Sequence, residues 1–329
     1  MFENNASDTR SPMTETPCWW SKDISPALHT ALAFINAARH CREPLDRCQR
    51  LFGALDTSWN AFARLHSPAS DRWTSEARFR TSDLQRCARL FQHGCKPECQ
   101  TAFLKSAAVR ELALLSPPVL DQSVWPDFGG RGGNFSAPDR EGQAAKHAKL
   151  REAFERHHAS RHDDGPREVL LKSVAGVVSL VRCNVMHGEN PPEGPARGQV
   201  ERDTKVLRIV GDVVEEFFEH LCALPSRRFA VYGTLAPGEV NSHLLECIKG
   251  DWSPADVRGR FGRRYGYPVY TWDPDQPART VQVFTSATLP EHWPRLDDFE
   301  GDHYRRHWVP VETAGEAAIC NIYEAAEPV

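Results

Sequence analysis

The spacing of apolar residues changes once along this chain, at Leu224-Pro225-Ser226, and that change restricts the folds it can adopt. Before this point, apolar residues recur every three or four positions, as they do on amphipathic helices. After it, short runs rich in β-branched and aromatic residues predict strands. We therefore predict a multidomain α and α+β protein. A helical bundle comes first, and a small mixed β-barrel or sheet with short helices follows.

The same patterns give the expected elements and domains. Helices are predicted at residues 25–38, 45–65, 80–93, 98–115, 166–187 and 201–223, and near 239–249 and 289–299. Strands are predicted at residues 229–235, 280–284, 304–311 and 318–323. Residues 117–140 are rich in glycine and proline but lack the Lys-Ser/Thr of a P-loop, so they predict an irregular loop. We expect a flexible tail at residues 1–24, a helical domain at 25–224 and an α+β domain at 228–329.

The charge of the chain limits its partners. Among 329 residues, 40 Lys and Arg stand against 44 Asp and Glu, which gives a formal net charge of -4. Residues 228–329 hold 10 basic and 15 acidic side chains, and residues 1–227 hold 30 and 29. Neither region has the basic excess of a tight, non-specific nucleic-acid binder. No window holds the ~18 uninterrupted apolar residues of a membrane span, and the first residues do not look like a signal peptide, so we expect a cytoplasmic protein without a membrane partner.

Ten cysteines raise the possibility of disulfides or a metal site. Without a signal peptide, reduced thiols are the better interpretation. One dense patch of Cys87, His93, Cys95 and Cys99 has the ligand types that bind zinc, but Cys95-x3-Cys99 has no matching second pair. We therefore expect no metal and no cofactor. A run of histidines is interpreted as a solvated helix face: His147, His157, His158 and His162.

Two stretches near the C-terminus carry the strongest signal. Residues 229–238 read F-A-V-Y-G-T-L-A-P-G, and residues 296–311 contain L-D-D-F-E-G followed by Tyr304, Arg306, Val309 and Val311. Together they resemble the gamma-glutamylcyclotransferase-like family, which includes the plant avirulence-induced-gene relatives. The family's marks are V-Y-G-T-L-x-x-G and L-D-x-F-E-G-x-x-Y-x-R-x-x-V-x-V. The resemblance implies the family's small mixed β fold. It also implies an enzyme that cyclises a gamma-glutamyl amine or amide to 5-oxoproline and releases the amine, a cyclising acyl transfer or lyase reaction.

The resemblance also implies roles for individual residues. Glu300 matches the family's catalytic glutamate. One carboxylate whose pKa is raised in a partly dry pocket can perform both proton transfers of this reaction, as general base and then general acid. Backbone N–H groups of the glycine loop at 233–235 would receive the substrate's carboxylate or carbonyl. Arg306 would pair with a substrate carboxylate or merely hold its strand. Substrate binding is thus assigned to Tyr232, Gly233, Thr234, Leu235, Tyr304 and Arg306.

A second resemblance lies in the helical region. Residues 178–189 read V-S-L-V-R-C-N-V-M-H-G-E, and they resemble the R-x(4–6)-H motif of the HEPN family of helical bundles. The matching residues are Arg182, Asn184 and His187. The resemblance implies a homodimer through this domain and, in many members, metal-independent RNA cleavage. Histidine would move the proton of the 2′-hydroxyl, and arginine would neutralise the phosphate. Alternatively, these residues cap the helix and the domain is a scaffold.

Two functions of different kinds therefore stand beside each other. The first is a gamma-glutamylcyclotransferase-like enzyme, with Glu300 as general acid/base, fused to a dimerising HEPN-like domain. The second is a HEPN endoribonuclease that uses Arg182 and His187, with the C-terminal domain as a small-molecule sensor or binding module. The C-terminal motifs are the more complete, and they favour the first function.

Overall fold

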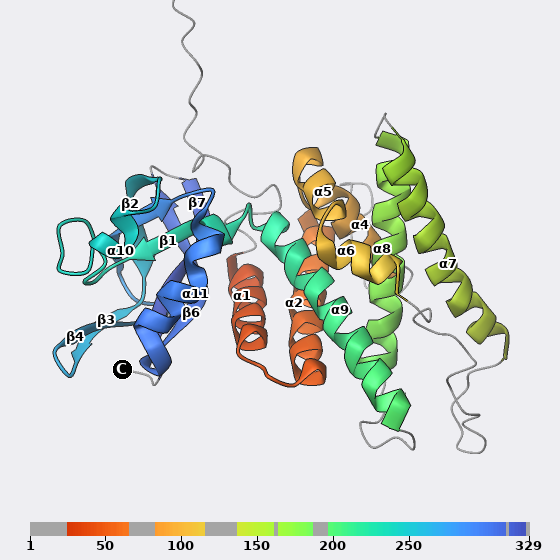
Figure 1. Ribbon diagram of the computed structural model, residues 1–329, viewed down its shortest axis with the longest axis horizontal. Helices are drawn as coiled ribbons and strands as arrows, with labels where there is room; N and C mark the ends of the chain where they lie inside the picture. The colour runs from red at the N-terminus through yellow and green to blue at the C-terminus, as the bar shows by residue number, and fades with distance from the viewer. Residues whose placement is uncertain are drawn as a thin grey trace, which may run out of the picture. The chain divides into compact units, whose positions relative to one another are not determined.

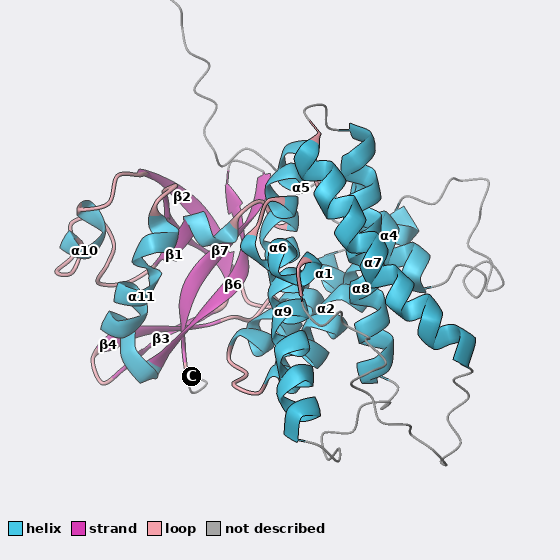
Figure 2. Cartoon of the chain, turned by 45° about the vertical axis from the view of Figure 1, so that its right-hand side comes forward, coloured by secondary structure: helices cyan, strands magenta, loops and turns pink. Residues whose placement is uncertain are grey.

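The computed structural model describes residues 25–65, 83–115, 137–160, 164–186, 197–313 and 316–326. The chain divides into two compact units, one from Cys18 to Leu221 and one that includes Cys222 to Val329. The described part of the first unit is helical, and the second unit contains the described strands (Figures 1 and 2). The mixed helical and sheet architecture predicted from the change in apolar spacing is confirmed. The expected tail at residues 1–24 lies outside the described residues.

The helices of the first unit follow the predicted apolar stripes, with two differences. They are α1 (Ser25–Arg39), α2 (Pro44–Leu65), α4 (Asp83–His93), α5 (Pro97–Leu104), α6 (Ala107–Ala113), α7 (Ala137–Ala159), α8 (Asp164–Met186) and α9 (Arg197–Leu221). The predicted helix at 98–115 is two helices, because the Ser106 side chain accepts a hydrogen bond from Val109 N and starts α6. Helix α7 was not among the predicted helices, because its apolar residues form no single stripe, and its start lies within the stretch predicted as an irregular loop.

Aromatic side chains from three helices fill part of the core of the first unit. Phe91 of α4 stacks on Phe217 of α9, with ring centroids 3.9 Å apart. Phe103 of α5 meets both rings edge-on, at 5.9 and 5.5 Å. Such pairs add specific geometry to the free energy gained by burying their surface. Around this cluster α2 packs against α1, α4 and α9, and α8 packs against α4 and α7.

The second unit is built around a small closed barrel. Its elements are β1 (Arg228–Val231), α10 (His243–Glu246), β2 (Asp251–Arg258), β3 (Arg260–Arg264), β4 (Tyr267–Thr271), β5 (Ala278–Thr285), α11 (Leu289–Glu300), β6 (Tyr304–Thr313) and β7 (Glu316–Ala325). The barrel order is β1-β5-β2-β6-β7. It closes through a parallel pairing of β1 with β7, and the other pairs are antiparallel. Strands β2, β3 and β4 were not predicted. Their exposed arginines, their glycines and Pro254 interrupt the alternation of apolar and polar residues that indicates a strand.

Strand β1 connects the barrel interior with the helix that covers it. Ala230 lies inside the barrel, and Phe229 and Val231 point to the other side, where they pack with Trp293 of α11. Trp293 Nε1 also donates to Ser226 O at 2.7 Å. These contacts fix α11 across the barrel, so its last residue, Glu300, lies beside the loop that follows β1.

Strands β3 and β4 form a separate two-stranded sheet, which we call the arm (residues 260–271). Its tight turn is at Tyr265 and Gly266, whose φ angles are +49° and +87°, as a hairpin turn of this kind requires. At its base Tyr270 is fully buried and donates to Arg258 O at 2.6 Å. Figure 1 shows the arm extending away from the barrel.

Candidate active site

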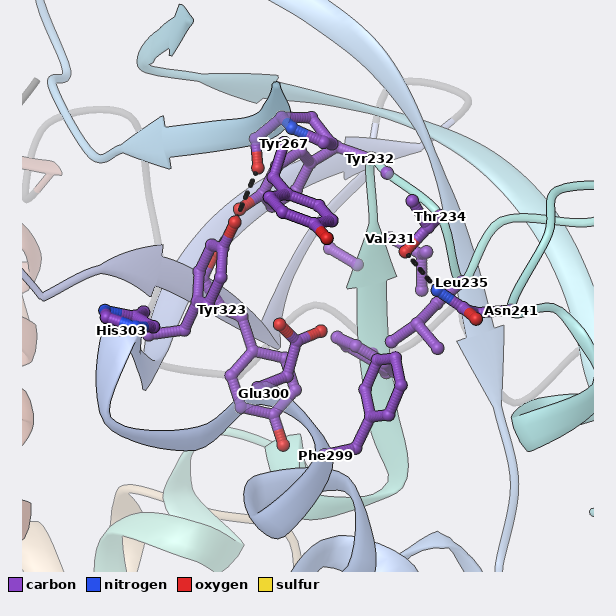
Figure 3. Close-up of a pocket in the computed structure, with 15 residues that line it drawn as sticks. Val231, Tyr232, Thr234, Leu235, Asn241, Tyr267, Phe299, Glu300, His303 and Tyr323 are labelled. Carbon is purple, nitrogen blue, oxygen red and sulfur yellow. Dashed lines mark hydrogen bonds between the residues drawn. The ribbon is translucent and has the colours of Figure 1, made fainter. Parts of the chain in front are cut away.

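A cavity of about 430 Å³ opens where β1 runs into the following loop. Of the residues predicted to bind or transform substrate, the structure brings these together around it: Tyr232, Gly233, Thr234, Leu235, Glu300 and Tyr304. Figure 3 shows the Glu300 carboxylate pointing into the space that these side chains enclose. Residues separated by up to 72 positions in the sequence thus share one pocket (232 to 304).

Glu300 has the properties of an acid–base group. It is partly buried, and its carboxylate makes no hydrogen bond or ion pair with the described residues. Burial raises the pKa of Glu300 to about 7, because a low-dielectric surrounding disfavours the charged form. Near neutral pH the group is therefore present in both protonation states, which suits a residue that accepts a proton and then returns it.

The loop after β1 is held in a fixed shape by its own hydrogen bonds. Asn241 donates from its backbone N to Thr234 O at 2.9 Å and from Nδ2 to Thr234 Oγ1 at 3.0 Å. Gly233 lies so close to the arm that a Cβ there would be 2.8 Å from Pro268 Cγ, which explains the glycine. The N–H groups of residues 233–235 donate to no acceptor among the described residues, so they are available to an anionic or carbonyl oxygen.

Tyrosine side chains build the walls of the pocket. Tyr232 OH donates to Tyr323 O at 2.8 Å, and Tyr304 OH donates to Pro268 O at 3.0 Å. Burial raises the pKa of both phenols, and the Glu300 carboxylate adds to the effect. Both are therefore neutral at physiological pH, and their hydroxyl protons are already used to hold β7 and the arm in place.

Arg306 does not line the pocket. It binds Asp297 of α11 through two hydrogen bonds, Nε to Oδ1 at 2.9 Å and Nη2 to Oδ2 at 3.1 Å. Its guanidinium also lies over the Trp293 ring, 4.4 Å from the centroid, and Asp297 accepts a further bond from Tyr323 OH at 2.7 Å. Of the two roles expected for Arg306, the structure shows the one that holds protein in place: it joins β6 to the last turn of α11, which carries Glu300.

Several residues of the pocket were not expected from the sequence. They are Phe229, Ala230, Val231, Asn241, Tyr267, Pro268, Phe299, His303 and Tyr323. Phe299 and His303 lie close to Glu300 in the sequence, and this proximity could have indicated that they line the pocket. Tyr267 and Pro268 start β4, a strand that was not predicted. Asn241 and Tyr323 reach the pocket only through tertiary structure.

The HEPN-like motif has a different environment. Arg182 binds Asp56 through Nε to Oδ1 at 2.7 Å and Nη2 to Oδ2 at 2.6 Å, and binds Asp83 Oδ2 through Nη1 at 2.9 Å. It also lies over the Trp59 ring, 5.0 Å from the centroid. Arg86 shares Asp83, at 2.7 Å. The guanidinium thus joins α8 to α2 and α4 and is already neutralised. The side chain of Asn184 and the whole of His187 lie outside the described residues.

The predicted solvated histidine face is wrong for two of its members. His147 and His157 are 2% and 5% exposed. His147 Nε2 is hydrogen-bonded to Leu112 O at 3.0 Å, and burial lowers its pKa, so it joins α7 to α6 as a neutral ring. His158 is exposed, and His162 lies outside the described residues.

No disulfide joins the cysteines of the described part of the chain. Within those same ranges, no group of three or more His, Cys, Asp or Glu side chains is arranged to hold a metal ion. No helix of the described ranges is long and apolar enough to cross a membrane.

Comparison with protein families gives one match. Residues 229–329 match the model of the family described as gamma-glutamyl cyclotransferase, AIG2-like. The matched segment begins one residue after the start of β1 and contains the whole pocket. Comparison with curated proteins gave no match.

Solved structures also match this part of the chain. YkqA from Bacillus subtilis is 28% identical, with a TM-score of 0.26, over 30% of this chain and 35% of that chain. An uncharacterized protein from Pyrococcus horikoshii is 25% identical, with a TM-score of 0.25, over 31% of this chain and 79% of that chain. An AIG2-like protein from Mus musculus is 19% identical, with a TM-score of 0.26, over the same shares. The chain therefore spans about a third of YkqA.

Proposed function

We propose, from the premise that residues 229–329 form a gamma-glutamyl cyclotransferase, AIG2-like domain, that this domain cyclises a gamma-glutamyl amine or amide. The α-amine of the glutamyl group attacks its own γ-carbonyl carbon. The bond from that carbon to the leaving nitrogen breaks, and the products are 5-oxoproline and the free amine. No atom from water and no redox partner enters the reaction.

Glu300 performs both proton transfers in this proposal. Its carboxylate removes a proton from the α-amine as the ring closes, and the resulting carboxylic acid gives that proton to the leaving nitrogen. The pKa of about 7 that burial gives Glu300 fits both steps. The observation that carries the proposal is this partly buried carboxylate, which has no hydrogen-bond partner among the described residues and shares one pocket with backbone N–H groups that donate to none of them.

The loop at residues 233–235 supplies the electrostatic part of catalysis. Its N–H groups donate to the α-carboxylate or to the γ-carbonyl oxygen, which becomes an oxyanion in the tetrahedral intermediate. Fixed donors in a partly dry site stabilise that charge without reorganising. Because ring closure is intramolecular, holding the amine near the carbonyl lowers the entropic cost of reaction.

For the helical region we propose a scaffold role. The domain boundaries we propose are residues 25–224 for a HEPN-like dimerising domain and 228–329 for the cyclising domain. Arg182 supports a scaffold, because its guanidinium is taken by Asp56 and Asp83 and would have to leave both to bind a phosphate. RNA cleavage stays a prediction, and equal cleavage by the wild type and by His187→Ala would remove His187 from it.

The decisive experiment is a substrate panel. The full-length protein is incubated with gamma-glutamyl amines, amides and peptides, and 5-oxoproline is measured. We expect release from at least one compound, with loss in Glu300→Gln and retention in Asp298→Asn, an exposed carboxylate two residues earlier on the same helix. Absence of product across the panel, or equal release by Glu300→Gln, would contradict the proposal.

A further inference from the structure

The helical unit brings a thiol, an imidazole and a carboxylate together between α5 and α9. Cys99 belongs to the dense cysteine patch of the sequence, and it lies in the first turn of α5. His220 lies in the last turn of α9, and Glu216 precedes it by one turn on the same face of that helix. The proposed cyclisation uses none of these three side chains.

The packing of α5 against α9 turns Cys99 towards His220. Phe103 lies one helical turn after Cys99 on the same face of α5, and its ring meets the His220 ring edge-on, with centroids 6.4 Å apart. Before α5, Gly94 approaches Leu221 so closely that a Cβ there would lie 3.0 Å from Leu221 Cδ1. Contacts on both sides of Cys99 in the sequence thus reach the end of α9, which lies beside α5 (Figure 1).

The His220 ring is buried with acidic groups around it. The residue is 7% exposed, and its Nε2 is hydrogen-bonded to Glu216 Oε1 at 3.2 Å. Nδ1 is buried without a conventional hydrogen-bond partner among the described residues, and the Cys99 thiol interacts with the ring. Burial lowers the pKa of His220, but Cys99 and Glu216 outweigh that effect and raise the pKa to about 9. At neutral pH the ring is therefore an imidazolium.

The two helix ends favour opposite charges at these positions. Cys99 is the third residue of α5, where backbone N–H groups and the helix dipole stabilise a negative charge. His220 is in the last turn of α9, where the dipole stabilises a positive charge. The thiolate is the nucleophilic form of cysteine, and a helix N-terminus or an adjacent imidazolium favours it. The environment of Cys99 combines both features.

Cys99 also differs from the other cysteines of its patch in accessibility. Cys87 and Cys95 are buried, and burial raises the pKa of the Cys87 thiol, as is typical of an inert structural cysteine. Cys99 is only partly buried, so a small molecule reaches it more readily than it reaches the other two.

We propose that Cys99 is a site of oxidation by hydroperoxides, with His220 as the proton donor to the leaving oxygen. The thiolate sulfur attacks the terminal oxygen of the hydroperoxide, and the O–O bond breaks. The oxygen that leaves takes the proton of the imidazolium. Sulfur is oxidised by two electrons to a sulfenic acid, and the hydroperoxide is reduced to water or an alcohol.

Competition between two thiols of the same molecule tests the proposal. Cys41 is the matched control, because it is also partly buried but its thiol donates to Ala37 O at 3.3 Å. Full-length protein is treated with hydrogen peroxide in the presence of dimedone, which labels sulfenic acids, and mass spectrometry follows each labelled peptide. We expect Cys99 to be labelled about tenfold faster than Cys41, since an ordinary thiol is only a few per cent ionised at neutral pH. Equal rates at the two cysteines would overturn the proposal.

Two further measurements connect the reactivity to the fold and to His220. In concentrated urea we expect the ratio of the two rates to fall to near one, and a ratio that persists there would contradict the role of the α5–α9 contact. In His220→Gln, whose folding is checked by circular dichroism, we expect Cys99 to react at about the rate of Cys41, because glutamine carries no charge and donates no acidic proton. Unchanged labelling of Cys99 in the folded variant would overturn the role of His220.

The wild-type ratio decides the proposal even where His220→Gln fails to fold. The readout is a labelled sulfur and needs no substrate turnover. The outcome is therefore independent of whether residues 229–329 cyclise gamma-glutamyl compounds.

Discussion

Each of the two units of this chain contains a sequence motif with one central charged side chain. The two side chains differ in whether they have a counter-ion among the described residues. In the helical unit, Arg182 is bound by Asp56 and Asp83 and covered by Trp59. In the barrel unit, Glu300 is held in a pocket and has no hydrogen-bond partner or counter-ion among the described residues. The first arrangement joins three helices through one guanidinium, and the second leaves a partly buried carboxylate facing a pocket.

The difference has a physical basis. When a desolvated charge is paired with good geometry, removing its partner costs much free energy of unfolding. Such a paired group is also poorly available to bind or transform a ligand. A charge that is desolvated and unpaired has its pKa displaced, as that of Glu300 is, and such groups are concentrated at functional sites. Both motifs resemble families with catalytic members. They differ in whether the charged side chain has a counter-ion among the described residues.

The largest expected effect is loss of activity in Glu300→Gln. Glutamine fills the same space but cannot transfer a proton, so we expect the rate of 5-oxoproline formation to fall by about 10²–10⁴-fold. Substrate binding should remain measurable by calorimetry. A rate within threefold of the wild type would show that Glu300 is only a wall of the pocket.

The second effect concerns the paired charge. Arg182→Ala leaves two carboxylates without their partner, and we expect the helical unit to lose about 2–3 kcal/mol, near 10²-fold in its opening equilibrium. This loss lies below the range of about 3–5 kcal/mol that is typical of a fully buried pair, because the Asp56 and Asp83 side chains are 26% and 39% exposed. Hydrogen exchange of α2, α4 and α8 measures the change.

Arg208→Ala is the control for that experiment. Arg208 pairs with Glu111 and Asp212, but its side chain is 46% exposed, so we expect a loss under about 1 kcal/mol. If both variants lost the same protection, Arg182 would not have the structural role described for it.

The third effect is a pH dependence of stability. The folded state raises the pKa of Glu300 from 4.5 to about 7, so between these values the folded protein binds more protons than the unfolded chain. The contribution of Glu300 to the free energy of unfolding is then fully present below pH 4.5 and is lost as the pH rises through about 7. For a partly buried group this loss is about 2 kcal/mol. Denaturant unfolding of wild type and Glu300→Gln at pH 5 and pH 8 measures it. We expect a smaller difference between the two pH values in Glu300→Gln, and the same difference in both proteins would contradict the pKa assignment.

The smallest effect concerns the residue that positions Glu300. Asp297→Asn weakens the bonds from Arg306 and Tyr323, so the last turn of α11 is held less firmly. We expect kcat to fall by about tenfold, since small displacements of a catalytic group are costly. KM should change little. Asp298→Asn is the control, and a change confined to KM would place Asp297 in substrate binding instead.

The sequence predicted the described helices other than α7, the strands β1, β5, β6 and β7, and six of the fifteen residues that line the pocket. Each of these predictions rests on a local pattern, which is an apolar stripe, an alternating run or a short motif. The two C-terminal motifs lie far apart in the sequence and come together only in the folded domain. The arm was not predicted, because its glycines and arginines give no alternation and its stability comes from burying Tyr270 at its base. The pairing of Arg306 with Asp297 was left open, since a motif lists residue types and does not give their partners.

His147 illustrates why burial is difficult to infer for single polar residues. Its helix, α7, has no clear apolar face, so nothing in the local pattern places the ring inward. Its hydrogen bond to Leu112 O depends on α6, 35 residues earlier in the chain. Partners at that distance in sequence are set by the packing of whole helices.

The pairing of β1 with β7 has a consequence for when the pocket can exist. Tyr232, just after β1, and Tyr323, in β7, both line the pocket and are joined by a hydrogen bond across 91 residues of sequence. The two strands are parallel neighbours that close the barrel. During synthesis the loop at residues 233–235 therefore leaves the ribosome before β7, the strand that forms the opposite wall of the pocket. A nascent chain stopped before Glu316 would carry both motifs intact and still have no closed site.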